Sequence, residues 1–144
     1  MTKKSIYNIL LALGLSLSVC AVSQAIVVED SLIVTDVTTV QFCVVWTTSE
    51  PAFGSVKVFE DPEGTILYSE AVVKFQSAEH PPAEDNGVMK VKVTGLKPNT
   101  VYYFQTVTTA KDPADAALYR YPADATFIVV KTEKASRDIV NSCV

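Results

Sequence analysis

The chain has 144 residues, with 12 basic and 16 acidic side chains, a net charge of −4 and a pI near 4.9. This length suits one domain, and so acidic a chain lacks the basic face that a general nucleic-acid-binding protein needs. Apolar residues make up 49% of the chain, which excludes an intrinsically disordered protein. With a single histidine there is almost no material for a Ser/His triad or a His-based metal site, so we expect no catalytic residue, no metal and no cofactor.

Residues 1–25 have the three parts of a secretory signal peptide. Two lysines give a positive start, an uncharged apolar run follows over residues 9–22, and Ser23-Gln24-Ala25 places small residues before the expected cleavage point. A transmembrane anchor is the alternative, but a span needs about 20 apolar residues, and this run is shorter and diluted by serine. We therefore expect an exported bacterial protein that is secreted, held at the cell surface or periplasmic.

Lipidation at Cys20 is a second alternative to simple cleavage. Leu17-Ser18-Val19-Cys20 resembles a bacterial lipobox in its Leu, Ser and Cys, although Val19 stands where such motifs carry Gly, Ala or Ser. A lipid on Cys20 would hold the domain on a membrane, whereas cleavage after Ala25 would release it. Cleavage removes two lysines and no acid, which leaves residues 26–144 with 10 basic and 16 acidic side chains and a net charge of −6.

After residue 25 the chain predicts strands. Short runs of β-branched and aromatic residues are separated by turn residues, which is typical of an all-β sandwich or barrel. The turn Asp61-Pro62-Glu63-Gly64 predicts a hairpin, and His80-Pro81-Pro82 predicts that residues 76–87 form a loop. The expected strands are residues 32–37, 42–47, 55–59, 66–69, 88–93, 101–108 and 125–132, with residues 71–75 as an eighth candidate.

Alternation within these strands predicts which side chains form the core. Apolar residues occupy every second position of three strands, whereas Lys90 and Lys92 point the other way from their apolar neighbours. We expect Trp46 at the centre of one core. The predicted inward sets are Phe42, Val44 and Trp46, then Met89, Val91 and Val93, and then Tyr102, Phe104 and Thr106.

The stretch Leu96-Lys97-Pro98-Asn99-Thr100-Val101-Tyr102 matches every named position of the pattern Leu-x-Pro-x-Thr-x-Tyr. It resembles the corner between strands E and F of fibronectin type III domains, and Val44-Val45-Trp46 resembles strand B of that family. The resemblance covers residues 30–132. It implies a seven-stranded immunoglobulin-like β-sandwich over residues 26–132, followed by a tail or linker at residues 133–144.

The same resemblance implies roles for core residues. Tyr102 would bury its ring and return its hydroxyl group to backbone a few residues upstream, with Leu96 as its buried partner. Trp46 and Phe104 would complete the structural core. Residues 87–104 are also similar to the N-terminal β-domain of purple acid phosphatases, which carry their chemistry in a separate domain.

These resemblances imply a non-catalytic extracellular binding or spacer module that presents loops and a sheet face to protein or polysaccharide at the cell surface. We expect no nucleic-acid partner, and membrane contact only through the signal peptide or lipidation at Cys20. One alternative is an accessory module of an extracellular hydrolase such as a metallophosphatase. Another is a structural subunit of a surface assembly that polymerises through sheet edges.

The connection over residues 109–122 is the expected partner contact. Tyr103 alternates outward on its strand, and together with Tyr119 and Tyr121 it would form an exposed aromatic patch. Packing of these rings against a neighbouring domain, a second copy or the chain's own tail is the favoured alternative. The candidate binding residues are Tyr103, Lys111, Asp112, Tyr119, Arg120 and Tyr121.

His80 is expected to be a solvated loop residue rather than a catalyst, because catalysis needs a constellation of groups. Its acidic neighbours Glu79, Glu84 and Asp85 could offer oxygen ligands to calcium together with Asn86, but their spacing does not match an EF-hand loop. A plain acidic loop is favoured.

Cys43 and Cys143 remain after signal cleavage, and an even pair in an exported chain suggests a disulfide. Closing so long a loop would stabilise the fold by up to about 5 kcal/mol on the chain-entropy argument. Two free thiols, or an intermolecular bond through Cys143, are the alternatives. Cys43 alternates away from the face of Trp46, so it is expected to point outward.

The signal peptide predicts a defined N-terminus. When the protein is expressed with its own first 25 residues in a bacterial host, the exported form should begin at Ile26, because signal peptidase cuts after small residues. The intact mass of the purified protein measures this. A mass that still includes residues 1–25 would contradict cleavage. A mass that shows a lipid on Cys20 would indicate lipidation instead of cleavage after Ala25.

Overall fold

A computed structural model describes residues 32–111, 118–124 and 126–135. Alternating apolar and polar side chains produce strands here, as in β5, where the buried and half-buried positions alternate without a break. The strands are β1 (Ile33–Thr35), β2 (Gln41–Thr47), β3 (Ala52–Phe59), β4 (Val72–Phe75), β5 (Val88–Thr94), β6 (Val101–Ala110), β7 (Leu118–Tyr121) and β8 (Ile128–Lys131).

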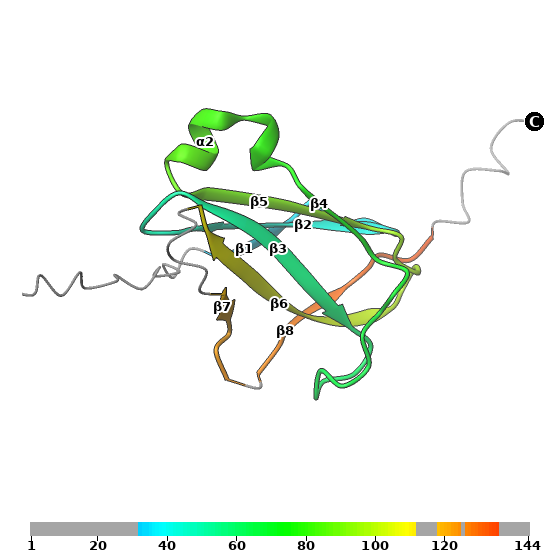
Figure 1. The fold of residues 1–144 in the computed structure, drawn as a ribbon. Helices are drawn as coiled ribbons and strands as arrows, with labels where there is room; N and C mark the ends of the chain where they lie inside the picture. The colour runs from blue at the N-terminus through cyan, green and yellow to red at the C-terminus, as the bar shows by residue number, and fades with distance from the viewer. Residues whose placement is uncertain (1–31, 112–117, 125, 136–144) are drawn as a thin grey trace, which may run out of the picture.

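The strands form two antiparallel sheets that pack face to face (Figure 1). One sheet has the order β1-β2-β5-β4, and in the other β6 pairs with β3 on one edge and with β7 and β8 on the opposite edge. The prediction of an all-β sandwich is thereby confirmed. No helix in the described part of the chain is long and apolar enough to cross a membrane.

The core lies between the sheets and is centred on Trp46, whose side chain is fully buried. The indole Nε1 donates a hydrogen bond to Thr108 Oγ1 at 3.1 Å, which joins β2 of one sheet to β6 of the other. Gly54 lies against the indole, since a Cβ atom there would come within 2.8 Å of Trp46 Cζ2. Phe42 and Phe104 also meet across the sheets, with ring centroids 5.3 Å apart.

A second cluster closes the end of the sandwich where β5 leads into β6. Tyr102 is 1% exposed, and its hydroxyl oxygen accepts a hydrogen bond from the backbone N–H of Lys97 at 2.9 Å, the contact that the corner motif predicts. Leu96 is buried beside it, and the ring of Tyr68 lies 5.0 Å from that of Tyr102.

Tyr68 ties this corner to the chain that crosses between the sheets. Its hydroxyl group lies 2.9 Å from Glu70 Oε2 and 3.0 Å from Gly95 O, and it can donate to one of them at a time. Burial raises the pKa of Tyr68, and the neighbouring Tyr102 and Glu70 raise it further. The phenol therefore keeps its proton and remains a donor.

Residues 66–69 do not form the strand that the sequence predicts. The turn at Asp61 does form, with Gly64 N donating to Asp61 O at 3.2 Å, but only one bridge follows, between Phe59 and Leu67. The Asp61 carboxylate instead accepts hydrogen bonds from the backbone of Thr65 and Ile66. These hydrogen bonds hold the backbone of Thr65 and Ile66 close to the turn, and the single bridge does not extend into a pair of strands.

Residues 76–87 are not simply a loop, which corrects the prediction. They contain a 3₁₀-helix, η1 (Ser77–Glu79), and a short helix, α2 (Pro81–Asp85), which Figure 1 shows outside the sheet next to β5. The two prolines that argued for a loop occupy the first turn of α2, where no intrahelical N–H donor is required. Asn86 Nδ2 donates to Pro82 O at 2.6 Å at the other end of the helix.

The last predicted strand, residues 125–132, is shorter than expected, and a further strand precedes it. β7, which lies within the predicted connection of residues 109–122, pairs with Thr106–Thr109 of β6, and β8 pairs with Val101–Phe104. Between them the chain leaves the sheet, and Gln105 Nε2 fills the gap by donating to Pro122 O at 2.7 Å.

The hydrogen bond between the sheets can be tested with Thr108→Val. This change keeps the side-chain shape but leaves the buried indole N–H without an acceptor, which should cost about 1–3 kcal/mol of unfolding free energy. Urea denaturation followed by tryptophan fluorescence measures the cost. Thr109→Val on the opposite face of β6 is the matched control and should change stability little. Equal stability of the two variants would contradict a structural role for this bond.

Candidate functional site

The residues expected to form an aromatic patch do not lie together. Cross-strand partners share one face of a sheet, and Tyr119 and Tyr121 are partners of Thr108 and Thr106, which are fully buried. Both tyrosines therefore face the inner side of their sheet, and Tyr119 packs against the core. Tyr103 lies on the outer side of the sheet, so the three rings do not form one exposed patch.

Arg120 lies on the outer face of the same sheet as Tyr103, opposite Val107. Asp112 lies outside the described residues. Of the five candidates that the structure describes, Tyr103 and Arg120 share the outer face of this sheet, whereas Tyr119 and Tyr121 face inward.

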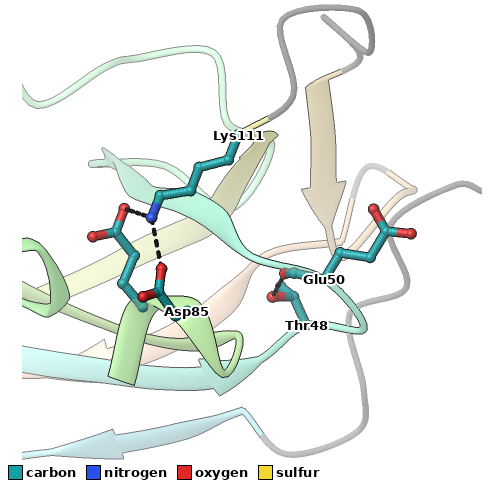
Figure 2. A network of polar contacts seen from close by, with 5 residues as sticks. Thr48, Glu50, Asp85 and Lys111 are labelled. Carbon is teal, nitrogen blue, oxygen red and sulfur yellow. Dashed lines mark hydrogen bonds and ion pairs between the residues drawn. The ribbon is translucent and has the colours of Figure 1, made fainter. Parts of the chain in front are cut away.

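Lys111 takes part in an ion cluster that Figure 2 shows from close by. Its Nζ lies 3.0 Å from Asp85 Oδ1 and 3.3 Å from Glu84 Oε1. Glu84 is 7% exposed, and the ion pair with Lys111 offsets the charge of its Oε1, which has no other hydrogen-bond partner within the described residues. The hydrogen bond to Asp85, with the help of Glu84, raises the pKa of Lys111. Lys111 is thus engaged within the protein rather than free for a partner.

Nearby backbone contacts hold α2 against the same end of the sandwich. Thr48 N donates to Gly87 O at 2.8 Å. Thr48 Oγ1 donates to Glu50 O at 2.7 Å, a contact that Figure 2 shows. Gly87 has a φ of 71° and passes so close to Thr48 that a Cβ atom would lie 2.3 Å from Thr48 O. These contacts and the Lys111 cluster fix the position of α2 relative to β2 and β3.

A cluster of basic side chains that the sequence analysis did not single out lies on the outer face of the sheet β1-β2-β5-β4. Lys74, Lys90 and Lys92 project from β4 and β5, and Lys74 is the cross-strand partner of Lys92. We call these three residues the lysine face. The sequence contains a signal for part of the lysine face, because Lys90 and Lys92 alternate with Met89 and Val91. That pattern alone, however, indicates an ordinary solvated surface.

A pocket of about 240 Å³ opens on this face, between the sheet and the segment that carries η1 and the start of α2. Its apolar wall comes from Val45, Val88 and Ala83, and its charged groups are Lys90, Glu79 and His80. The residues that line it are Val45, Gln76, Ser77, Glu79, His80, Ala83, Val88 and Lys90.

The lysine face is only partly neutralised. Lys74 Nζ lies 2.6 Å from Glu79 Oε1, a contact that lowers the pKa of Glu79, whereas Lys90 Nζ is 4.0 Å from Asp36 Oδ2 at the limit of an ion pair. Lys92 has no ion-pair partner in the described part of the chain. Lys90 and Lys92 therefore leave positive charge available beside the pocket, on a chain that is acidic as a whole.

Cys43 points to this outer face, as its alternation with Trp46 predicts, but it is buried there at 3% exposure. Its Sγ is 4.0 Å from Gln76 Oε1, and its cross-strand partner is Lys92. Burial raises the pKa of Cys43, Asp36 adds to this shift, and Lys90 and Lys92 oppose it. The thiol is free in the structure, and Cys143, the predicted disulfide partner, lies outside the described residues.

His80 is exposed and precedes α2, where it forms part of the pocket wall. Within the described ranges, no group of three or more His, Cys, Asp or Glu side chains is arranged to hold a metal ion. Among the acids considered for calcium, Glu79 pairs with Lys74, while Glu84 and Asp85 both face Lys111.

Comparisons with known proteins identify no relative. Scans against protein-family models, curated proteins and solved structures each returned no match.

The burial of Cys43 predicts slow alkylation. After reduction, iodoacetamide should modify Cys43 at pH 8 much more slowly in the folded protein than in urea, because a buried thiol with a raised pKa offers little thiolate. Peptide mass spectrometry of the Cys43 peptide follows the reaction. Equal rates with and without urea would contradict this burial. Protection that appears only without the reduction step would instead indicate the disulfide with Cys143.

Proposed function

We propose that this chain is a non-catalytic binding module of an exported protein, with a sandwich of the fibronectin type III kind. The strand orders β1-β2-β5-β4 and β3-β6 with β7 and β8 correspond to the A-B-E-D and C-F-G sheets of immunoglobulin-like sandwiches, which supports this assignment. The hydrogen bond from Lys97 N to the Tyr102 hydroxyl supports it as well.

The observation that carries the proposal is the pocket beside the lysine face. Lys90, which lines the pocket and is only weakly paired with Asp36, attracts negative charge to it, whereas the rest of this acidic protein repels negative charge. The pocket therefore suits an anionic group, such as a carboxylate, on a protein or polysaccharide at the cell surface.

The rest of the pocket wall suggests what carries that carboxylate. Val45, Val88 and Ala83 offer apolar contact, while Gln76 and His80 offer polar groups near the charge of Lys90. A sugar ring or an aliphatic side chain that bears a carboxylate would satisfy both parts. Exposed charge pairs contribute about 0.2–1 kcal/mol each, so a single group should bind weakly, and several copies on a polymer would bind through avidity.

A second candidate function is an accessory module of an extracellular hydrolase. Its support is the similarity of residues 87–104 to the N-terminal β-domain of purple acid phosphatases, a stretch that spans β5, the Tyr102 corner and the start of β6. The same stretch contributes Val88 and Lys90 to the pocket. In that setting the pocket would hold substrate or partner near a separate catalytic domain.

Titration with sodium glucuronate, followed by NMR shifts of backbone amides, tests the proposed function. We expect millimolar binding, with the largest shifts at Ser77, Val88 and Lys90, and weaker binding as salt is raised. Lys90→Gln should weaken binding about two- to fivefold, as expected for one exposed charge pair. The control Lys57→Gln removes an exposed lysine of β3, in the other sheet, and should leave binding unchanged.

Three results would count against the proposal. Glucuronate could shift no pocket amide, uncharged glucose could shift them equally, or Lys90→Gln could bind as well as the unchanged protein. The non-catalytic assignment has its own test in a screen with phosphate and glycoside substrates. Robust turnover that His80→Ala abolishes would overturn it.

A further inference from the structure

The eight-residue strand β3 lies at the edge of its sheet, paired with β6 on one side only (Figure 1). On the free side, Val58 O accepts a hydrogen bond from Tyr68 N, and Glu60 N donates to Ile66 O. Backbone groups of alternate residues point to the same side of a strand, so those of Gly54 and Val56 also point to this edge. Nothing in the described part of the chain pairs with them there.

The other edges of the two sheets are short or interrupted. β1 has three residues, β4 has four and carries Lys74, and β7 and β8 divide one edge into two four-residue strands. Such features prevent unwanted strand pairing in natural proteins. β3 has neither a proline nor a break between Ala52 and Phe59, and only its last residues are covered, by the chain around Leu67.

The outward side chains of β3 form a pattern that is complementary to itself. Phe53, Ser55 and Lys57 are exposed on one face of the strand, with Phe53 at 48% exposure. If two β3 strands pair in an antiparallel manner about Ser55, each Phe53 lies opposite Lys57 of the second copy, and the two Ser55 residues lie opposite each other. An aromatic ring beside a lysine stem is a favourable cross-strand pair, and this register brings no like charges together.

The backbone allows the same register. Gly54 of each copy would exchange hydrogen bonds with Val56 of the other, and both residues point their backbone groups to the free edge. Val58 O already accepts a hydrogen bond from Tyr68 N on this side, so pairing between the two copies would end at Lys57 and the ladder would be short. We propose that β3 joins two copies of this chain across a twofold axis at Ser55, making one continuous sheet from the two β3-β6 sheets.

A second copy fits this edge better than an unrelated peptide does, because the outward side chains of β3 are complementary to those of the same strand in reverse. Each of the three outward positions finds its counterpart in the same strand reversed, which is what a twofold contact requires. The ring of Phe53 is 48% exposed, and its centroid lies 6.4 Å from that of Phe75 in the other sheet. This contact is separate from the pocket, so dimerisation and anion binding can fail independently.

Charge reversal at the twofold axis gives a direct test by sedimentation velocity of the purified protein. Ser55 is exposed, so Ser55→Lys and Ser55→Asp should both fold, as circular dichroism will check. Each variant alone places two like charges on directly opposite residues, whose Cα atoms would lie about 4.5 Å apart across the axis, and should be monomeric. An equal mixture of the two should restore a dimer, because it places opposite charges there.

Leu118→Lys is the control, since it adds a charge at an exposed position on β7 at the far edge of the same sheet. This variant should remain dimeric like the unchanged protein. The proposal is overturned if the unchanged protein is monomeric up to several hundred micromolar. It is also overturned if Ser55→Lys leaves the oligomer intact, or if the mixture of charge variants stays monomeric.

Discussion

The burial of one indole between two sheets is the constraint on which this domain depends. Trp46 projects from β2, rests against Gly54 of β3 and donates its hydrogen bond to Thr108 of β6. The ring therefore contacts both sheets, and its single polar group is satisfied only when they lie in one relative position. Because interiors are close-packed and unpaired polar groups are costly to bury, this one side chain fixes how the sheets are stacked.

The outer features follow from that stacking. With β2, β3 and β6 fixed, two contacts hold α2 against the end of the sandwich. These are the hydrogen bond between Thr48 and Gly87 and the ion pair between Lys111 and Asp85. The segment with η1 and α2 then stands over the outer side of β5 and closes the pocket. At the opposite end, Tyr102 and Tyr68 satisfy their hydroxyl groups where the chain passes from one sheet to the other. The pocket thus rests on a support that is rigid for reasons unrelated to ligand binding.

Charge is distributed unevenly over this scaffold, and that bears on what it can bind. The strands that carry Lys74, Lys90 and Lys92 place all three on one outer face of an acidic protein. Lys74 is offset by Glu79 at close range, so the less neutralised charges of this face are those of Lys90, which lines the pocket, and Lys92. Salt bridges at such exposure add little to stability, so these lysines contribute little to holding the fold together.

The sequence by itself determined the strands that alternate most strongly, β2, β5 and β6, and the burial of Trp46 and Tyr102, because alternation and the corner motif are local properties. It did not determine that residues 66–69 would stay unpaired or that Leu118–Tyr121 would pair with β6. Nor did it place Tyr103 and Tyr119 on opposite faces, or bring residues 76–83 over Lys90. The local sequence pattern predicts to which face of its strand a side chain points. Which strand lies beside it depends on the packing of segments that are distant in the sequence, and only the tertiary structure shows this.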